Sequence, residues 1–191
     1  MKQNIMQIAL SNGEKEETVS LPIAQSDADE LAGRIAVTDI DDCKVSKIDV
    51  FNEYLAGIKR CVNPNFTALN NIAKWADSTR INDFGNPLET FAAVLEAKNI
   101  TDINDALLVT ENIDSYDFVD AQTAGDYGHF VLYESTREDI DPCFAEEVED
   151  YIDYEAYGEW RAEQDGAVKT SRGYVIDNTD FRQTHDMDMR M

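Results

Sequence analysis

Carboxylates are the most abundant side chains through which this sequence could do chemistry. Its 191 residues include 39 Asp and Glu against 16 Lys and Arg, with only two histidines and three cysteines. Paired carboxylates can serve as general acid and base, or hydrolyse glycosidic bonds. With so many acids, pairs arise by chance, and no spacing singles one pair out. The carboxylates therefore do not by themselves predict a catalytic site.

The other reactive residue types do not complete a catalytic or cofactor site either. His129 stands in an apolar run and His185 in a polar stretch, and the cysteines are odd in number and far apart. Residues 125–128 lack the Lys of a phosphate-binding loop. The acids at 39–42 lack the central Gly and closing Glu of a calcium loop. We therefore expect a protein that is not an enzyme and takes no cofactor and no metal.

The acidity restricts the partners that this protein can have. Its formal net charge is −23, and phosphates are held by clusters of Lys and Arg, so direct nucleic-acid binding is disfavoured. Docking on an anionic membrane leaflet is disfavoured for the same reason. A basic protein is the natural partner. No apolar run approaches the roughly 18 residues of a membrane span, and residues 2–7 interrupt any signal-peptide pattern, so we expect a cytoplasmic location.

The acidic residues are unevenly distributed. Residues 112–191 hold 21 acids and 6 bases, a net charge of −15, whereas residues 1–66 and 67–111 each carry −4. A dedicated interaction surface produces such an imbalance. The main alternative, the acidic coat of a halophilic protein, would be spread more evenly.

Apolar periodicity divides the chain into three segments with an α+β fold. In residues 1–66, alternation predicts strands near 5–10, 19–23 and 45–50, with a helix starting at a capping box at Ser26. Residues 67–111 are predicted to be a helical middle domain. Its helices would start at Thr67, Asn86–Pro87 and Thr101.

Residues 112–191 form the third segment, an acidic C-terminal α+β domain. Strands are predicted at 129–133 and 173–176, with a helix from Asp141–Pro142 to about Gly158 and a turn at 125–128. The predicted domains are therefore 1–66, 67–111 and 112–191.

The helix expected after Pro142 has two faces of opposite character. An apolar stripe within an arc of roughly 100° is formed by Phe144, Val148, Tyr151 and Ile152. Nearly opposite stand four acids in mutual i,i+3 and i,i+4 relations: Glu146, Glu149, Asp150 and Asp153. Each like-charge pair costs roughly 0.2–0.5 kcal/mol, which indicates a purpose other than stability. Glu155 would fall toward the apolar side, so we expect an irregularity near it.

The charge density of this helix is close to that of DNA. From Pro142 to Tyr157 it would span about 24 Å, with about one carboxylate per 4 Å. A single strand of B-DNA carries one phosphate charge per about 3.4 Å. A surface of this kind could occupy a groove built for a DNA backbone.

One short stretch resembles a known family. Residues 150–158, Asp-Tyr-Ile-Asp-Tyr-Glu-Ala-Tyr-Gly, resemble the C-terminal signature of the ArdA-type antirestriction proteins. Val19–Ile23 is similar to an early strand of that family that ends at Pro, and Ala68–Asn70 to a helix start. Members are described as elongated, dimeric DNA mimics made of three small domains, usually encoded on mobile genetic elements. They occupy the DNA site of type I restriction–modification enzymes.

The resemblance implies an antirestriction protein that competes for the DNA-binding groove of a type I restriction–modification enzyme. The alternative is an acidic module that inhibits another basic DNA-binding protein, such as a nucleoid or CRISPR component. The expected partner-binding face comprises Glu138, Asp139, Asp141, Glu146, Glu147, Glu149, Asp150, Asp153, Glu155 and Glu159. A homodimer would double the charged surface, with an interface expected at Tyr154, Tyr157 and Trp160.

Overall fold

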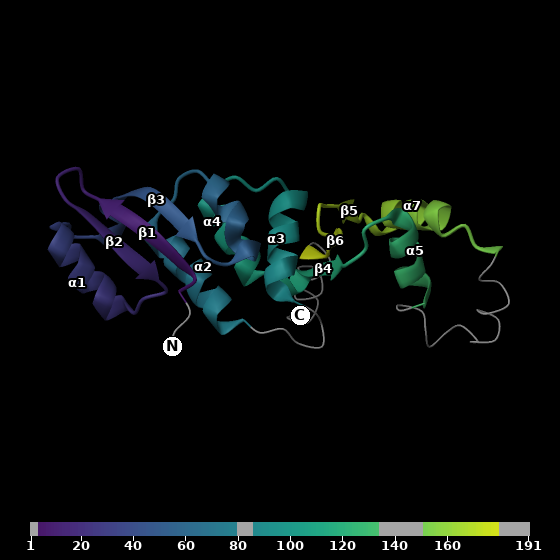
Figure 1. Ribbon diagram of the computed structural model, residues 1–191, viewed down its shortest axis with the longest axis horizontal. Coiled ribbons are helices and arrows are strands. Elements are labelled where there is room, and N and C mark those ends of the chain that lie inside the picture. Colours follow the sequence, from purple (N-terminus) through teal and green to yellow (C-terminus); the bar gives the residue numbers. More distant parts are fainter. Residues whose placement is uncertain (1–3, 80–85, 134–150, 180–191) are drawn as a thin grey trace, which may run out of the picture. The chain divides into compact units, whose positions relative to one another are not determined.

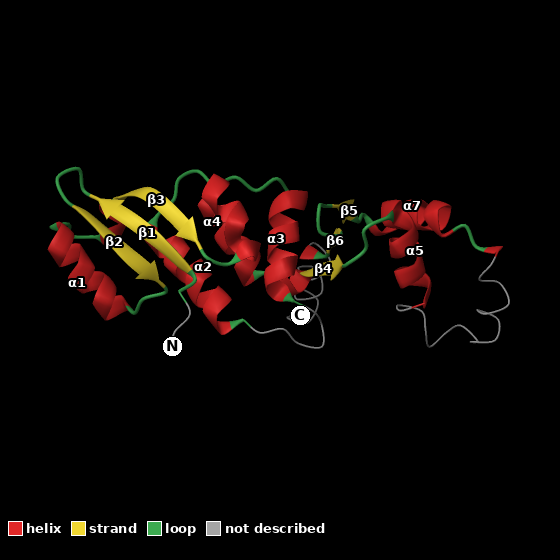
Figure 2. Cartoon of the chain, in the orientation of Figure 1, coloured by secondary structure: helices red, strands yellow, loops and turns green. Residues whose placement is uncertain are grey.

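The computed structural model describes residues 4–79, 86–133 and 151–179 (Figure 1). The chain divides into two compact units, residues 1–113 and 114–191. Each unit contains a three-stranded antiparallel sheet with helices, so the predicted α+β class is confirmed (Figure 2). The predicted string of three domains is not confirmed, because the first two segments belong to one unit. The later boundary, predicted after residue 111, falls close to the division observed.

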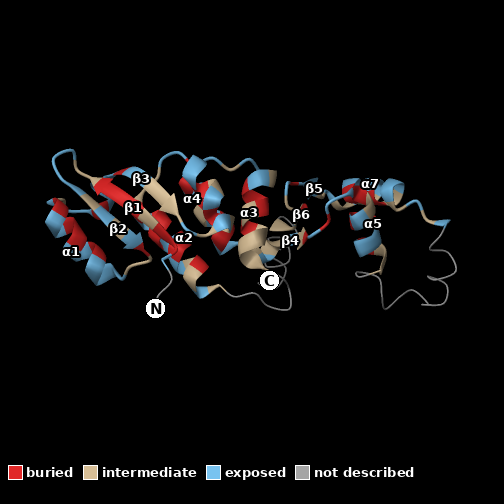
Figure 3. Ribbon diagram, viewed as in Figure 1, coloured by how far each residue is buried: buried red, intermediate tan, exposed pale blue. Residues whose placement is uncertain are grey.

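The first unit begins with the sheet that the alternation predicted. Strands β1 (Met6–Ser11), β2 (Glu16–Leu21) and β3 (Lys44–Val50) pair in the order β2-β1-β3. Ile8 lies opposite Val19 and Ile48, so apolar side chains share one face. Helix α1 (Gln25–Ile35) buries one side and exposes the other (Figure 3). Its predicted Ser26 cap is wrong: the N-cap is Ala24, which makes no side-chain cap.

The remainder of the first unit is helical, as predicted. It contains the 3₁₀ helices η1 (Ile40–Asp42) and η2 (Glu53–Arg60), followed by α2 (Phe66–Ser78), α3 (Pro87–Ala97) and α4 (Ile103–Glu111). Asn86 caps α3 with Pro87 in the first turn, which confirms that start. The caps at Thr67 and Thr101 are wrong. Asn65 caps α2 instead, accepting a hydrogen bond from Ala68 N, and Asp102 caps α4, accepting one from Asn104 N. Short Asn and Asp side chains reach these backbone N–H groups.

A buried amide shows why the predicted boundary near residue 66 does not separate two domains. Asn70 on α2 is 5% exposed. Its Oδ1 accepts from Ile23 N at 2.9 Å, and its Nδ2 donates to Ile23 O at 3.2 Å. A second link is made by Asp41, whose carboxylate accepts from the backbone N–H and hydroxyl of Thr67. The sheet segment and the helical segment are therefore bonded within one unit.

In its described residues, the second unit packs two helices with a small sheet. The division between the units falls within η3 (Ile113–Ser115). The described elements of the second unit are β4 (Tyr116–Val119), α5 (Ala124–Tyr133), α7 (Tyr154–Asp165), β5 (Val168–Lys169) and β6 (Tyr174–Asp177), with strand order β4-β6-β5. The core consists of Val119, Ala121, Tyr127, Val131, Ala162 and Tyr174. The strand predicted at 173–176 is confirmed as β6.

The strand predicted at 129–133 and the turn predicted at 125–128 are both wrong, because these residues form α5. A capping box starts the helix: Thr123 N donates to the Asp126 carboxylate at 2.9 Å, and Asp126 N donates to the Thr123 hydroxyl at 3.0 Å. This reciprocal pair fixes a helical turn where the glycines suggested a reverse turn.

The helix predicted from Pro142 to Gly158 is not continuous. Residues 134–150, including Phe144 and Val148, lie outside the described residues. Ile152 and Asp153 are non-helical, and a new helix, α7, begins at Tyr154. Tyr151, expected in the core-facing stripe, is 87% exposed. The irregularity expected near Glu155 is confirmed, because Asp153 caps α7 by accepting from Ala156 N at 3.1 Å.

Candidate acidic interface

Helices α5 and α7 cross so closely that their backbones touch. A Cβ built on Gly158 would lie 1.8 Å from the carbonyl oxygen of Ala124, and one on Gly128 would lie 2.5 Å from that of Tyr154. No side chain fits at either position, so both glycines are required by the crossing. The glycine that ends the family-like stretch therefore has a structural reason for its place.

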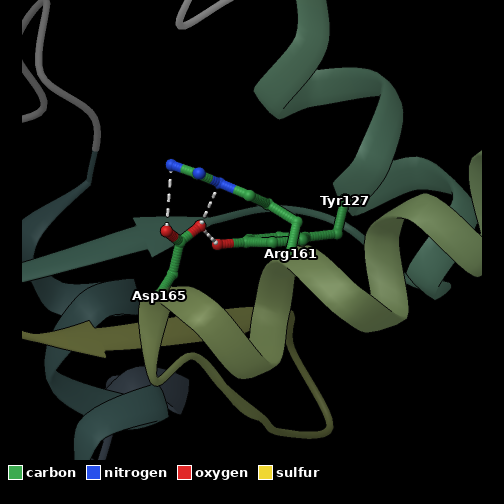
Figure 4. Close-up of polar contacts among 3 residues, drawn as sticks. All are labelled: Tyr127, Arg161 and Asp165. Carbon is green, nitrogen blue, oxygen red and sulfur yellow. Dashed lines mark hydrogen bonds and ion pairs between the residues drawn. The ribbon is translucent and has the colours of Figure 1, made fainter.

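A partly buried polar network joins the same two helices. Tyr127 on α5 is fully buried, and its hydroxyl donates to Oδ2 of Asp165 at 2.8 Å. Arg161 donates from Nε to Oδ2 at 3.1 Å and lies 3.0 Å from Oδ1 through Nη2 (Figure 4). Burial, followed by the bond to Asp165, raises the pKa of Tyr127 well above its usual 10.0. Arg161 and Asp165 therefore neutralise one another inside the unit.

Three exposed carboxylates of this unit hold helix starts. Asp153 caps α7, and Oε2 of Glu155 accepts from Gly125 N in the first turn of α5 at 2.7 Å. Asp126 closes the capping box of α5, and the hydrogen bonds from Thr123 lower the pKa of its carboxyl below 3.8. Negative charge at a helix N-terminus is favourable. Asp153 and Glu155 thus have structural roles besides any role toward a partner.

The acids of the described second unit are mostly exposed and outnumber its cations. In residues 114–133 and 151–179 there are ten Asp and Glu and three Lys and Arg. Nine of the ten are exposed: Asp114, Asp117, Asp120, Asp126, Asp153, Glu155, Glu159, Glu163 and Asp177. The tenth, Asp165, forms the ion pair with Arg161. This part of the chain therefore carries an excess of exposed negative charge.

The predicted partner-binding acids divide into two groups. Asp153, Glu155 and Glu159 lie on or next to α7 and are exposed. The other seven lie outside the described residues: Glu138, Asp139, Asp141, Glu146, Glu147, Glu149 and Asp150. Glu163 was not predicted, although it continues the i,i+4 series of Glu155 and Glu159 along α7. That spacing was the available signal, and the expectation that the helix ended at Gly158 concealed it.

The three aromatics expected at a dimer interface have different surroundings. Tyr154 is part of an internal cluster: its hydroxyl bonds to that of Tyr133 at 2.9 Å, and its ring centroid lies 5.4 Å from that of His129. Tyr157 and Trp160 contact one another, with ring centroids 6.0 Å apart, and Trp160 is 52% exposed. Trp160 is therefore the aromatic of the three that presents most surface.

Residues that could support catalysis are not brought together in the described residues. His129 is exposed and lies 4.8 Å, ring to ring, from Tyr133. Burial raises the pKa of the Cys43 and Cys61 thiols, which disfavours the reactive thiolate. In the ranges that the structure describes, no group of three His, Cys, Asp or Glu side chains is placed to hold a metal ion. None of the helices described there is long and apolar enough to span a membrane.

Comparisons with known proteins do not identify a family for this sequence. No protein-family model matches the sequence, and a search of curated proteins found no significant similarity. The ArdA-like stretch at residues 150–158 therefore remains a resemblance over nine residues.

Proposed function

We propose that this protein is an antirestriction DNA mimic that occupies the basic DNA-binding groove of a type I restriction–modification enzyme. The observation that carries the proposal is the excess of acid in the described second unit, where nine exposed carboxylates are found with three cations. Carboxylates placed where a groove expects phosphates attract the same Lys and Arg side chains. The ArdA-like stretch supplies the choice of target among basic DNA-binding proteins.

The mechanism is direct competition without covalent chemistry. Association is steered by charge, and the mimic excludes DNA because both need the same basic surface. Glu159 and Glu163 are suited to this role, since they are exposed. Asp153 and Glu155 present their charge from fixed positions, because each is also held by a backbone N–H. A nucleoid or CRISPR component with a similar groove is the alternative target.

Restriction assays with purified components test the proposal. A type I enzyme is given unmodified plasmid DNA, with and without the protein, and cleavage and methylation are followed. We expect cleavage to be inhibited, added DNA to relieve the inhibition, and inhibition to weaken between low and moderate NaCl because salt screens the charges. Inhibition that does not depend on DNA concentration, or that is unchanged by salt, would contradict a mechanism in which carboxylates mimic phosphates.

A matched pair of variants locates the surface. Replacing Glu159 and Glu163 by Gln removes two exposed charges from α7. Replacing Glu14 and Glu30 by Gln removes two exposed charges from the first unit. We expect the first pair to weaken inhibition more than the second. The homodimer and the cytoplasmic location also stay predictions, which sedimentation and cell fractionation would test.

A further inference from the structure

Helix α7 exposes its largest side chain, Trp160, away from the face that packs on its own unit. It buries Gly158 and Ala162, the smallest residues available, against α5. Trp160 lies two positions from each of them, roughly 200° away around the helix. It is 52% exposed. Exposed tryptophan is a residue type enriched at the energetically dominant positions of protein interfaces, so this position is suited to recognition.

The surroundings of Trp160 leave its ring accessible. Its neighbours one turn away are Ala156, Tyr157, Glu163 and Gln164. Tyr157 supports one side, at 6.0 Å between ring centroids and an interplanar angle of 39°. Ala156 is too small to cover the ring, and Glu163 is exposed beside it. The result is an aromatic surface bordered by a carboxylate.

The charges around Trp160 determine which kind of ligand can bind this surface. A second copy docked through Trp160 would bring Glu159 and Glu163 toward the same residues of its partner, and like charges repel. We therefore assign Trp160 to a basic partner protein and not to the homodimer interface expected from the sequence. Residues 134–150 of the chain itself carry eight acids and one base, so they have the wrong sign as well. Arginine has the right properties, because its planar guanidinium stacks on an aromatic ring and bonds a carboxylate at the same time.

Two of the three cations in the described second unit have side-chain partners within it. Arg161 is bound to Asp165, and Nζ of Lys169 lies 5.9 Å from the ring centroid of Tyr174. An arginine supplied by a basic partner would therefore not compete with Arg161 or Lys169 for the ring of Trp160.

We propose that Trp160, supported by Tyr157 and bordered by Glu163, is the docking point for an arginine side chain of a basic partner protein. The proposal rests on the proposed function in that the arginine belongs to the groove that α7 enters. A mimic built in this way offers its partner a flat ring next to an anion, as a nucleotide does. It would favour arginine-rich grooves over lysine-rich ones.

Two basic peptides, deca-arginine and deca-lysine, test this without any restriction enzyme. Binding of each to the full chain is measured at one ionic strength, for the parent and for Trp160→Ala. We expect the parent to prefer deca-arginine, and Trp160→Ala to reduce that preference by about two- to fivefold while leaving the lysine affinity unchanged. Trp160→Tyr should keep most of the preference. Phe51→Ala, at a residue 58% exposed in the first unit, is the matched control and should change nothing.

A residue-level readout accompanies the affinities. The protein has two tryptophans, Trp75 and Trp160, whose indole N–H signals in a ¹H–¹⁵N spectrum are assigned with Trp160→Phe. Deca-arginine should shift the Trp160 signal more than that of Trp75. An arginine preference that survives Trp160→Ala, or an unshifted Trp160 signal, overturns the proposal. So does a Trp160→Ala variant that melts markedly lower, or one that converts a dimer into monomers. Failure to inhibit a type I enzyme would defeat the proposed function but leave these peptide results standing.

Discussion

The bond between Tyr127 and Asp165 gives the most quantitative prediction for the second unit. Tyr127→Phe removes only the hydroxyl from a fully buried ring and leaves the packing against Tyr174 in place. A hydrogen bond to a charged acceptor contributes about 1.5–3 kcal/mol. Asp165 keeps its bonds to Arg161 and its side chain is 18% exposed, so water can replace part of the loss. We therefore expect a destabilisation of about 1–2 kcal/mol.

Hydrogen exchange is the suitable assay, because the chain has two compact units and a single unfolding transition is not assured. Exchange of α5 and α7 amides should speed up in Tyr127→Phe, while amides of α2 and α3 keep the parental rates. Asp165→Asn and the double variant complete a cycle that isolates the coupling between the two residues. A loss below about 0.5 kcal/mol, or additive single effects, would refute the assignment of this bond as stabilising.

The same network predicts a response to alkali. Since the folded pKa of Tyr127 is raised, its contribution is fully present below the ordinary value of 10.0 and is lost as pH rises toward the folded pKa. The second unit should therefore weaken above pH 10, and Tyr127→Phe should show a shallower decline. An equal decline in the stability of both proteins would assign the alkaline response to other groups. One such group is Tyr174, because burial raises its pKa as well.

Three further predictions follow from particular contacts. Gly158→Ala places a methyl group against the carbonyl of Ala124 and should lower the free energy of unfolding by more than about 3 kcal/mol. The α5 and α7 amides should then lose protection from hydrogen exchange. A melting temperature equal to that of the parent would contradict the crossing. Asn70→Leu leaves both backbone groups of Ile23 unpaired and should destabilise the first unit by about 2–3 kcal/mol in urea titrations, whereas an unchanged midpoint would show that the link is dispensable. Because the pKa of the Asp126 carboxyl is lowered, its contribution to stability is present above pH 3.8 and is lost as pH falls below that value. In that acidic range the melting temperature of Asp126→Asn should therefore depend less on pH than that of the parent. Parallel curves of melting temperature against pH for the two proteins would contradict this prediction.

Local signals predicted the elements that depend on short-range patterns. Alternation located β1, β2 and β3, and the Asn86–Pro87 pair located the start of α3. The same reasoning failed at 129–133, where a run of five residues without polar interruption fits a strand or a buried helix equally well. The capping box at Thr123 and Asp126 decides for the helix, and it lies six residues earlier.

The acidic character of the candidate site could be predicted from the sequence, but the positions of its side chains could not. The concentration of acid in residues 112–191 was evident from the sequence. An irregularity near Glu155 was also expected, but its exact place before Tyr154 was not, because Asp153 suits both an exposed helical position and an N-cap. The exposure of Trp160 depends on the glycine crossing of α5 with α7, a contact between segments 30 residues apart, whose register no local pattern reveals. Tertiary packing therefore decided which side chains of α7 face outward.

Competition for a type I enzyme by a charge-depleted variant tests the central claim most directly. Glu146, Glu149, Asp150 and Asp153 are replaced together by Gln or Asn, with Asn at 153 because Asn caps a helix about as well as Asp. Displacement of labelled DNA from the enzyme is measured by anisotropy, and the melting temperature is measured on the same samples. We predict that the parent displaces DNA, that the variant needs a higher concentration to do so, and that it melts no lower than the parent. A variant that displaces DNA as well as the parent, or an enzyme that binds DNA and the protein together, would contradict the claim that these carboxylates stand in for phosphates.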